Sequence, residues 1–492
     1  MSAATLPLVI QGGMGVAVSN WRLARAVSSA GQLGVVSGTA LDTVLIRRLQ
    51  DGDVGGAMRR ALEQLPIAGV ARDLLRRYFR PEGRAPGEPY RALPMYKRAV
   101  SALREQVTIA ANFVEVHLAK EGHAGRVGIN LLTKVQMPTL ASLYGAMLAR
   151  VDVVLMGAGI PREIPGALDA LARGEAATLR FDVDGQPADD PLTLRFDPTD
   201  HSAVPAPLDR PRFYAIVSAH SLATTLARKA NGVVDGFVVE GATAGGHNAP
   251  PRGAPQLNER GEPVYGARDA ADLGAMRDLG VPFWLAGGAG SPQALRAARD
   301  QGAAGIQVGT AFAYADESGF TPEIKRQVLQ DLAAGQLGIF TDPRASPTGF
   351  PFKLVQSPGL VQADETRERI CDLGYLRSAA RRTDGRIVYR CAAAPVDDFV
   401  AAGGTVEQTE GRKCLCNGLA AAVGLGQVRR DGSEEASLVT SGDSLLELAA
   451  VAQGRTSYTA HDVLDYLLSE PTTPDVDVAP VSASRADERS PP

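Results

Sequence analysis

A strand followed by a helix recurs through the first two-thirds of this 492-residue chain. Eight short runs rich in apolar residues, mostly ending in glycine, alternate with stretches that have a helical pattern. The predicted strands cover residues 6–13, 33–38, 126–132, 151–157, 213–219, 236–241, 282–288 and 305–311, and predicted helices between them include 20–31, 221–232, 270–280 and 291–302. Since this alternation indicates a parallel sheet and eight strands close a barrel, we expect an α/β protein with a (β/α)8 TIM barrel.

An open doubly wound sheet shows the same alternation and is the competing fold. The glycine-rich ends of the last two predicted strands favour the barrel, because barrels commonly bind phosphate there. We assign residues 1–335 to the barrel and expect an inserted helical segment at 42–105. The amphipathic patterns in the insert suit helices that cover the barrel mouth or form a subunit contact, and both alternatives stay open.

Three other segments depart from a minimal barrel. A polar stretch at 178–198 is expected to form a β-hairpin around Asp184 and Gly185. Residues 336–470 lose the strand–helix alternation and are expected to form a C-terminal extension that packs on the barrel. Residues 471–492 are rich in Pro, Asp and Ser and are expected to be a disordered tail.

Charge and hydropathy exclude some classes of partner. Lys and Arg number 51 against 55 Asp and Glu, a formal net charge of −4, and the basic residues do not gather into a stripe. A nucleic-acid partner is therefore not expected. No run of about 18 apolar residues and no secretory leader is found, so we expect a cytoplasmic protein without a membrane partner. Association into a homo-oligomer stays open.

The end of the first predicted strand carries a glycine-rich sequence. Gly12 and Gly13 are followed by Met14, and glycines let the backbone approach a flat ligand without interference from Cβ atoms. Barrel chemistry takes place at the carboxyl ends of strands, where these residues would lie. A tight strand-to-helix turn explains the same glycines, and this alternative stays open.

The ends of the last two predicted strands indicate a phosphate site. The first carries Gly287 and Gly288, and the second carries the run Gln307, Val308, Gly309 and Thr310. Small residues expose backbone N–H groups to a phosphate, and Thr310 adds a hydroxyl. A glycine turn would explain either loop alone, but it would have to occur at both, so we favour phosphate binding.

A histidine lies on another glycine-rich loop, after the predicted strand 236–241. His247 follows Gly245 and Gly246, and imidazole can take or give a proton near neutral pH. The loop position favours a functional role over that of a structural or solvent-exposed histidine. Asn130, at the end of the predicted strand 126–132, would point into the same mouth and could bond a ligand edge or cap a turn.

All four cysteines of the chain lie within a short part of the extension. Four thiolates can hold a structural zinc ion or an iron–sulfur centre, and a metal there would tie the extension together. The Cys-x-Cys pair is unlike a standard zinc finger, and four unrelated buried thiols are the favoured alternative. The tentative metal ligands are Cys371, Cys391, Cys414 and Cys416.

The sequences QGGMG, GINLL, GGH, LAGGAG and QVGTAF, in this order within residues 6–320, resemble those of the nitronate monooxygenase family. The resemblance implies an FMN-binding flavoprotein in which Gly12, Gly13 and Met14 lie along the flavin and Asn130 bonds it. It also implies that His247 is the catalytic base and that alkyl nitronates or nitroalkanes are oxidised with O2. The other implied cofactor-binding residues are Gly246, Gly287, Gly288, Gln307, Val308, Gly309 and Thr310.

Two positions depart from the family pattern. Thr243 stands where the family commonly has glutamate, and Glu240 stands where glutamine is common. The NAD(P)H-dependent FMN enoyl-[acyl carrier protein] reductases of fatty acid or polyketide synthesis share the glycine–histidine loop and are the alternative enzyme class. A flavin-binding scaffold without turnover is a third reading, and the intact His247 argues against it.

Overall fold

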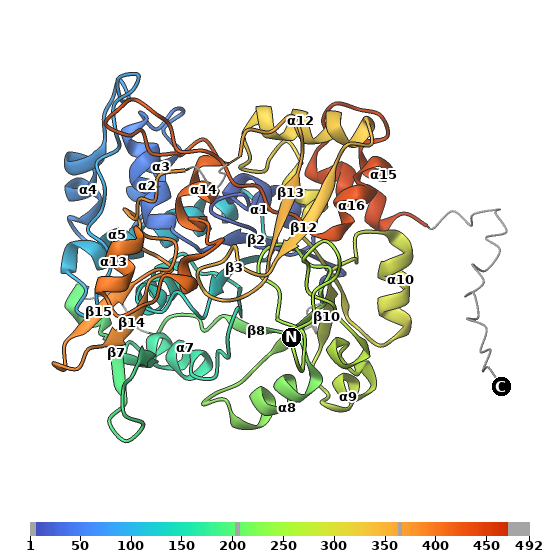
Figure 1. The fold of residues 1–492 in the computed structure, drawn as a ribbon, viewed down its shortest axis with the longest axis horizontal. Coiled ribbons are helices and arrows are strands. Elements are labelled where there is room, and N and C mark those ends of the chain that lie inside the picture. Colours follow the sequence, from blue (N-terminus) through green and yellow to red (C-terminus); the bar gives the residue numbers. More distant parts are fainter. Residues whose placement is uncertain (1–5, 202–206, 363–366, 471–492) are drawn as a thin grey trace, which may run out of the picture.

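The computed structural model describes residues 6–201, 207–362 and 367–470 (Figure 1). Its central element is an eight-stranded sheet in which every pair of neighbours is parallel, in the order β1-β11-β10-β9-β8-β4-β3-β2. The strands are β1 (Val9–Gln11), β2 (Gly34–Ser37), β3 (Val127–Leu132), β4 (Val153–Gly157), β8 (Arg212–Val217), β9 (Gly236–Glu240), β10 (Phe283–Ala286) and β11 (Gly305–Val308).

The two outer strands of this order meet each other. A parallel bridge joins Ile10 in β1 to Leu33 just before β2, and the Gln11 backbone N–H donates to the Leu33 carbonyl at 2.9 Å. The sheet is therefore closed into a barrel, and the predicted TIM barrel is confirmed. Seven strands lie within the segments expected from the sequence, and β8 begins one residue earlier, at Arg212; the Val- and Ile-rich runs of these strands are buried.

Alternate strand residues form a hydrophobic cluster separate from the main core and fill the barrel. Its largest members, Tyr214 in β8 and Trp284 in β10, stack with ring centroids 4.8 Å apart, and the Trp284 indole N–H donates to the Pro7 carbonyl at 2.9 Å. Ile10, Val35 and Leu155 pack in the same cluster. The interior is thus a packed core, which leaves the strand ends as the place for a site.

Helices surround the barrel, and the four predicted from the sequence are present. Several begin where a side chain caps the first turn, as Asn20 does for α1 and Ser291 for α10. The helices that follow the barrel strands are α1 (Trp21–Ser29), α5 (Ala102–Lys120), α6 (Thr139–Leu148), α7 (Ile164–Ala172), α8 (His220–Lys229), α9 (Leu273–Asp278), α10 (Pro292–Asp300) and α11 (Thr310–Ala313). None of the described helices is both long and apolar enough to cross a membrane.

The insert between β2 and β3 forms α2 (Leu41–Gln50), α3 (Ala57–Leu62) and α4 (Val70–Tyr78), which pack against α5 (Figure 1). Asp42 of α2 is buried and forms an ion pair with Arg104 of α5, with Oδ2 and Nη2 2.9 Å apart. The hydroxyls of Tyr96 and Tyr375 also donate to the Asp42 carboxylate. Since Tyr375 belongs to the extension, this buried cluster joins the insert to it.

The polar stretch before β8 forms the expected antiparallel pair, β5 (Ala177–Phe181) with β7 (Leu192–Phe196). The expected turn around Asp184 and Gly185 is present, because the Gln186 backbone N–H donates to the Val183 carbonyl at 3.1 Å and Gly185 has a φ of +76°. Beside this turn, β6 (Val183–Asp184) also pairs in parallel with β14 (Ser378–Arg381) of the extension. Val183 packs against Ala379 and Phe181 in a small apolar cluster, so the connection between β5 and β7 is longer than a two-residue turn.

After α12 (Pro322–Ala333), the extension wraps from the mouth to the side of the barrel, in yellow, orange and red in Figure 1. Its last helix, α16 (Ala460–Leu468), contacts α1 and α10. Its other elements are β12 (Gly338–Asp342), β13 (Phe352–Gln356), β14, β15 (Ile387–Arg390), α13 (Val396–Ala401), α14 (Leu415–Ala421) and α15 (Leu448–Ala452). Short 3-10 helices are η1 (Pro198–His201), η2 (Ala267–Asp269), η3 (Glu407–Thr409) and η4 (Asp443–Glu447). The tail expected at 471–492 lies outside the described residues.

Candidate active site

A cavity of about 430 Å³ lies at the carboxyl ends of the barrel strands. This volume is in the range of small-molecule and cofactor sites. The structure brings together every cofactor-binding and catalytic residue expected from the sequence. Those that line the cavity are Gly12, Gly13, Met14, Asn130, Gly246, His247, Gly287, Gly288, Gln307, Val308, Gly309 and Thr310.

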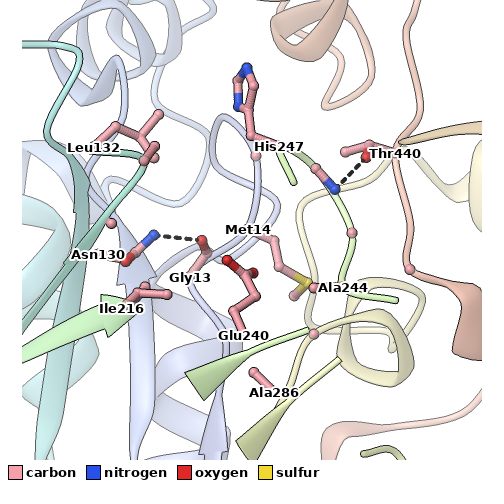
Figure 2. A pocket seen from close by; sticks show the side chains of 18 of the residues that line it. Gly13, Met14, Asn130, Leu132, Ile216, Glu240, Ala244, His247, Ala286 and Thr440 are labelled. Carbon is pink, nitrogen blue, oxygen red and sulfur yellow. Dashed lines mark hydrogen bonds between the residues drawn. The ribbon is translucent and has the colours of Figure 1, made fainter. Parts of the chain in front are cut away.

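The loop after β1 is held by Ser19, which is fully buried. The Ser19 hydroxyl donates to the Gly12 carbonyl at 2.7 Å and accepts from the Met14 backbone N–H at 2.9 Å. A Cβ on Gly13 would come within 2.3 Å of the Asn130 Cβ, so only glycine allows this approach. The Asn130 side-chain amide donates to the Gly13 carbonyl at 3.1 Å, which fixes the end of β3 against the loop (Figure 2).

The loops after β10 and β11 form a second glycine-lined wall. Gly287 has a φ of +85°, and a Cβ there would lie 2.9 Å from the backbone nitrogen of Ala244. The Thr310 hydroxyl, expected to serve a phosphate, accepts from the Gly442 backbone N–H at 3.0 Å. The extension therefore reaches the region where the sequence places a phosphate.

Two acceptors in the cavity wall are suited to a ligand. The Asn130 Oδ1 and Gln307 Oε1 atoms are buried and have no hydrogen-bond partner in the structure. A buried amide oxygen without a donor costs about 1–3 kcal/mol, so a ligand that donates to it is stabilised. A flavin has a flat ring system with polar edges and a phosphate, and the glycine-lined walls and these acceptors fit such a group.

His247 is held between the barrel and the extension. Its Nε2 atom and the Ser346 Oγ atom form a hydrogen bond of 2.7 Å. The Phe352 ring packs edge-on against the imidazole, with centroids 4.9 Å apart. Burial first, and the positive charge of Lys134 second, lower the pKa of His247 to about 4. The imidazole is therefore neutral near pH 7 and can accept a proton.

Glu240 ends β9 and points into the same cavity, apart from His247 in the view of Figure 2. Among the described residues that line the cavity it is the only one with a carboxyl group. Burial raises the pKa of Glu240 to about 7. A large share of this carboxyl is therefore protonated at neutral pH, and the cavity carries little negative charge.

Sequence reasoning missed the part of the wall that the extension supplies. The Thr440 hydroxyl accepts from the Gly246 backbone N–H at 3.0 Å (Figure 2), and the Ser441 hydroxyl bonds the Tyr314 hydroxyl at 2.7 Å. Phe350 and Tyr375 line the cavity as well. The run of small polar residues at 440–444 was the one available signal, and it lies far from any predicted strand.

The four cysteines of the extension surround a second, much smaller cavity of about 10 Å³. Cys416 lines both this cavity and the large one. Over the described part of the chain, no group of three or more His, Cys, Asp or Glu side chains is arranged to hold a metal ion.

Residues 195–338 match the model of a protein family described as nitronate monooxygenase. The matched region is less than a third of the chain and runs from β7 to the start of β12. It includes His247, Gln307 and the glycine pairs at 245–246 and 287–288. No curated protein sequence matches the chain.

Solved structures with a similar arrangement include FabK from Thermotoga maritima, at 16% identity and a TM-score of 0.45, with 94% of this chain and 91% of that chain covered. Nitroalkane oxidase from Streptomyces ansochromogenes has 15% identity and a TM-score of 0.44, with 94% and 95% covered. Because both TM-scores lie below 0.5, these similarities are not used to assign the fold. The barrel is assigned from the strand pairing within this chain.

The nitronate monooxygenases are flavin-dependent oxidoreductases, and the matched region contributes four of the eight barrel strands and the histidine loop. The resemblance expected from the sequence is therefore confirmed, since residues 195–338 are similar to the nitronate monooxygenase family.

Proposed function

We propose that this protein is an FMN-dependent oxidoreductase that oxidises alkyl nitronates, and nitroalkanes after loss of a proton, with O2 as the second substrate. One observation carries the proposal. The neutral imidazole of His247 lies on the wall of a cavity that is also lined by the glycine-rich ends of β1, β10 and β11. A group that can accept a proton, beside the region suited to a flat cofactor, supports the proposal.

The residues proposed to hold FMN are those with room or free acceptors for it. Gly12, Gly13 and Met14 would lie along the ring system, and the Asn130 and Gln307 side chains offer unpartnered oxygens to its polar edges. The loops at 287–288 and 307–310 would hold the phosphate through backbone N–H groups. When bound, the flavin would accept the two electrons of the substrate and pass them to O2.

The charge in and beside the cavity suits an anionic substrate of modest size. Lys134 does not line the cavity, but its Nζ atom lies 3.5 Å from the ring centroid of Phe350, which does. Burial lowers the pKa of Lys134 to about 8, so it is mostly charged at pH 7. Glu240 is partly neutral there. A nitronate is an anion with an alkyl chain, and apolar side chains such as Leu132 and Ile216 line the same cavity.

His247 would serve the neutral form of the substrate. A nitroalkane must lose a proton from the carbon next to the nitro group before it can be oxidised as a nitronate. A neutral imidazole can take this proton, and the anion formed beside it would raise the low pKa of His247. A preformed nitronate would need His247 only as a hydrogen-bonding partner.

Oxygen uptake by the purified full-length protein tests the proposal. The flavin is first released by heat and identified by chromatography, with FMN expected. O2 consumption with propyl-2-nitronate, without a nicotinamide, is the expected activity. NADPH-dependent reduction of a crotonyl thioester, with no response to nitronate, would contradict the proposal and assign the chain to enoyl reduction. A protein that binds no flavin would contradict both functions.

A further inference from the structure

One side of the large cavity is apolar, and most of it is built by the extension. This side, the apolar chamber, is formed by the side chains of Val16, Leu132, Tyr375, Leu376, Leu415 and Leu419. We propose, on the basis of the proposed function for the reacting group, that the apolar chamber binds the alkyl chain of the substrate. The substrates would then be nitronates with chains of several carbons, longer than that of propyl-2-nitronate.

The side chains of the apolar chamber form one continuous surface. The two barrel residues and Tyr375 lie in or against one hydrophobic cluster. Leu376 and Leu419 pack against this cluster and also against a second one, which contains Leu415 and Phe352. The chamber is therefore a single apolar wall and not a set of scattered side chains.

The apolar chamber begins beside His247. The Phe352 ring packs edge-on against the imidazole, with centroids 4.9 Å apart, and it shares a cluster with Leu415. In the view of Figure 2, His247 and Leu132 lie away from Ala286 at the end of β10. A substrate whose reacting carbon lies at His247 can therefore direct its chain along Phe352 and Leu415 into the chamber.

The chamber offers no free polar group to a ligand. None of its six side chains carries a charge, and the only hydroxyl among them is that of Tyr375. This hydroxyl donates to the Asp42 carboxylate and forms a hydrogen bond of 2.6 Å with the Thr43 hydroxyl. Water in such a space lacks hydrogen-bond partners, so its displacement by an alkyl chain is favourable.

The same hydrogen bonds hold the Tyr375 ring in place at the chamber wall. The Arg104 Nη2 atom lies 2.9 Å from the Asp42 Oδ2 atom and 3.2 Å from the Tyr375 hydroxyl. Buried charged groups are costly to separate from their partners, so this wall does not move aside easily. The gain in affinity from a longer chain should therefore stop at a definite chain length.

The test is calorimetric titration of the purified full-length protein with butanoate, hexanoate, octanoate and decanoate. A carboxylate resembles a nitronate, because both are planar anions with two oxygens, but the flavin does not oxidise it. The Kd should fall by about threefold to fourfold for each added CH2 until the chamber is filled. The heat capacity change of binding should become more negative along the same series.

A charged probe and two matched variants locate the chain. Adipate has the length of hexanoate with a second carboxylate at its far end, and it should bind at least about tenfold more weakly than hexanoate. Leu419→Gln puts an amide into the chamber, and the gain for each CH2 should fall below about twofold. Leu360→Gln should keep the wild-type gain, because Leu360 is a partly buried leucine of the extension that does not line the cavity.

Three results would overturn the proposal. They are a Kd that does not fall from butanoate to decanoate, adipate that binds as tightly as hexanoate, and a gain for each CH2 in Leu419→Gln equal to that of the wild type. The first two are measured on the wild-type chain, so they hold even if the variant does not fold. Because the probes are not oxidised, the expected series of Kd values without bleaching of the flavin by a nitronate would keep the apolar chamber and remove only the proposed reaction.

Discussion

The His247 Nε2 atom lies 2.7 Å from the Ser346 Oγ atom, although the two residues are 99 positions apart in the chain. His247 belongs to a barrel loop, and Ser346 lies between β12 and β13 of the extension. The Thr348 backbone N–H and hydroxyl bond the same serine oxygen at 3.2 and 2.8 Å. The orientation of the proposed catalytic imidazole is therefore set by the extension.

Loss of the Ser346 hydroxyl should weaken catalysis without removing it. Ser346→Ala takes away one hydrogen bond, which is worth about 0.5–1.5 kcal/mol, so kcat/KM for a neutral nitroalkane should fall by roughly 2- to 10-fold. Ser28→Ala is the matched control, since Ser28 is also buried and donates to the Arg126 carbonyl at 2.7 Å, and neither residue lines the pocket. Equal effects of the two variants on kcat/KM would show that Ser346 acts only through stability.

Replacement of His247 should separate the two forms of the substrate. His247→Ala should keep FMN bound and lower kcat/KM for a neutral nitroalkane by about 10²- to 10⁴-fold, the usual range for a general base. The rate with a preformed nitronate should fall much less, because no proton has to be removed. Steady-state rates of O2 uptake with both forms measure this difference. A wild-type rate on the neutral form would remove His247 from the mechanism.

The pH profile should follow the lowered pKa of His247. Because that pKa is about 4, the imidazole is in its basic form over the whole range above pH 5. In the wild type, kcat/KM for the nitroalkane should therefore lose no activity to protonation of His247 between pH 8 and pH 5. A fall centred near pH 6.5, the ordinary value for histidine, would show that His247 is not buried as the structure has it.

Glu240 should make stability depend on pH. The pKa of Glu240 in the folded state is raised from 4.5 to about 7. The contribution of Glu240 to the stability of the folded state is therefore fully present below pH 4.5 and is lost as pH rises through 7. Glu240→Gln removes the charge, and its free energy of unfolding should exceed that of the wild type at pH 8 by about 1–3 kcal/mol. Denaturant titrations of flavin-free protein at pH 5 and pH 8 measure this gap, which should be smaller at pH 5. A gap of the same size at both pH values would mean that the carboxyl stays ionised.

The contact of the extension with the phosphate region should be sensitive to a single methyl group. A Cβ on Gly442 would lie 2.8 Å from the Thr243 carbonyl oxygen and 3.0 Å from the Gly245 nitrogen. Gly442→Ala should push these loops apart and weaken FMN binding by about tenfold or more. Gly266→Ala is the control, because its Cβ would meet nothing within 4 Å. Fluorescence titration of the flavin-free variants measures both, and equal affinities would place the phosphate elsewhere.

The barrel could be predicted because its signals are local. Each strand is a short buried run, as in Val153–Gly157, and its end is marked by a glycine or a polar residue that meets the mouth. The residues of these ends, such as Asn130 and His247, could therefore be assigned to one site before their distances were known. Closure by the bridge of Ile10 to Leu33 then brings β1 beside β2.

The contribution of the extension could not be predicted, because it depends on contacts between distant residues. Nothing near Thr440 in the sequence indicates that its hydroxyl meets the Gly246 backbone, and nothing near Tyr375 indicates that it reaches Asp42. The pairing of β6 with β14, beside the predicted turn at Asp184, could not be predicted for the same reason. The cysteines could be counted from the sequence, but their common cavity needed the fold.

The most direct test of the proposed function is anaerobic reduction of the bound flavin, followed by stopped-flow absorbance. Propyl-2-nitronate, NADH and NADPH are mixed separately with the purified full-length protein. The structure and the family match lead us to expect rapid bleaching of the flavin by the nitronate alone, with recovery when O2 is added. Bleaching by NADH or NADPH, and none by the nitronate, would contradict nitronate oxidation and identify a nicotinamide-dependent reductase.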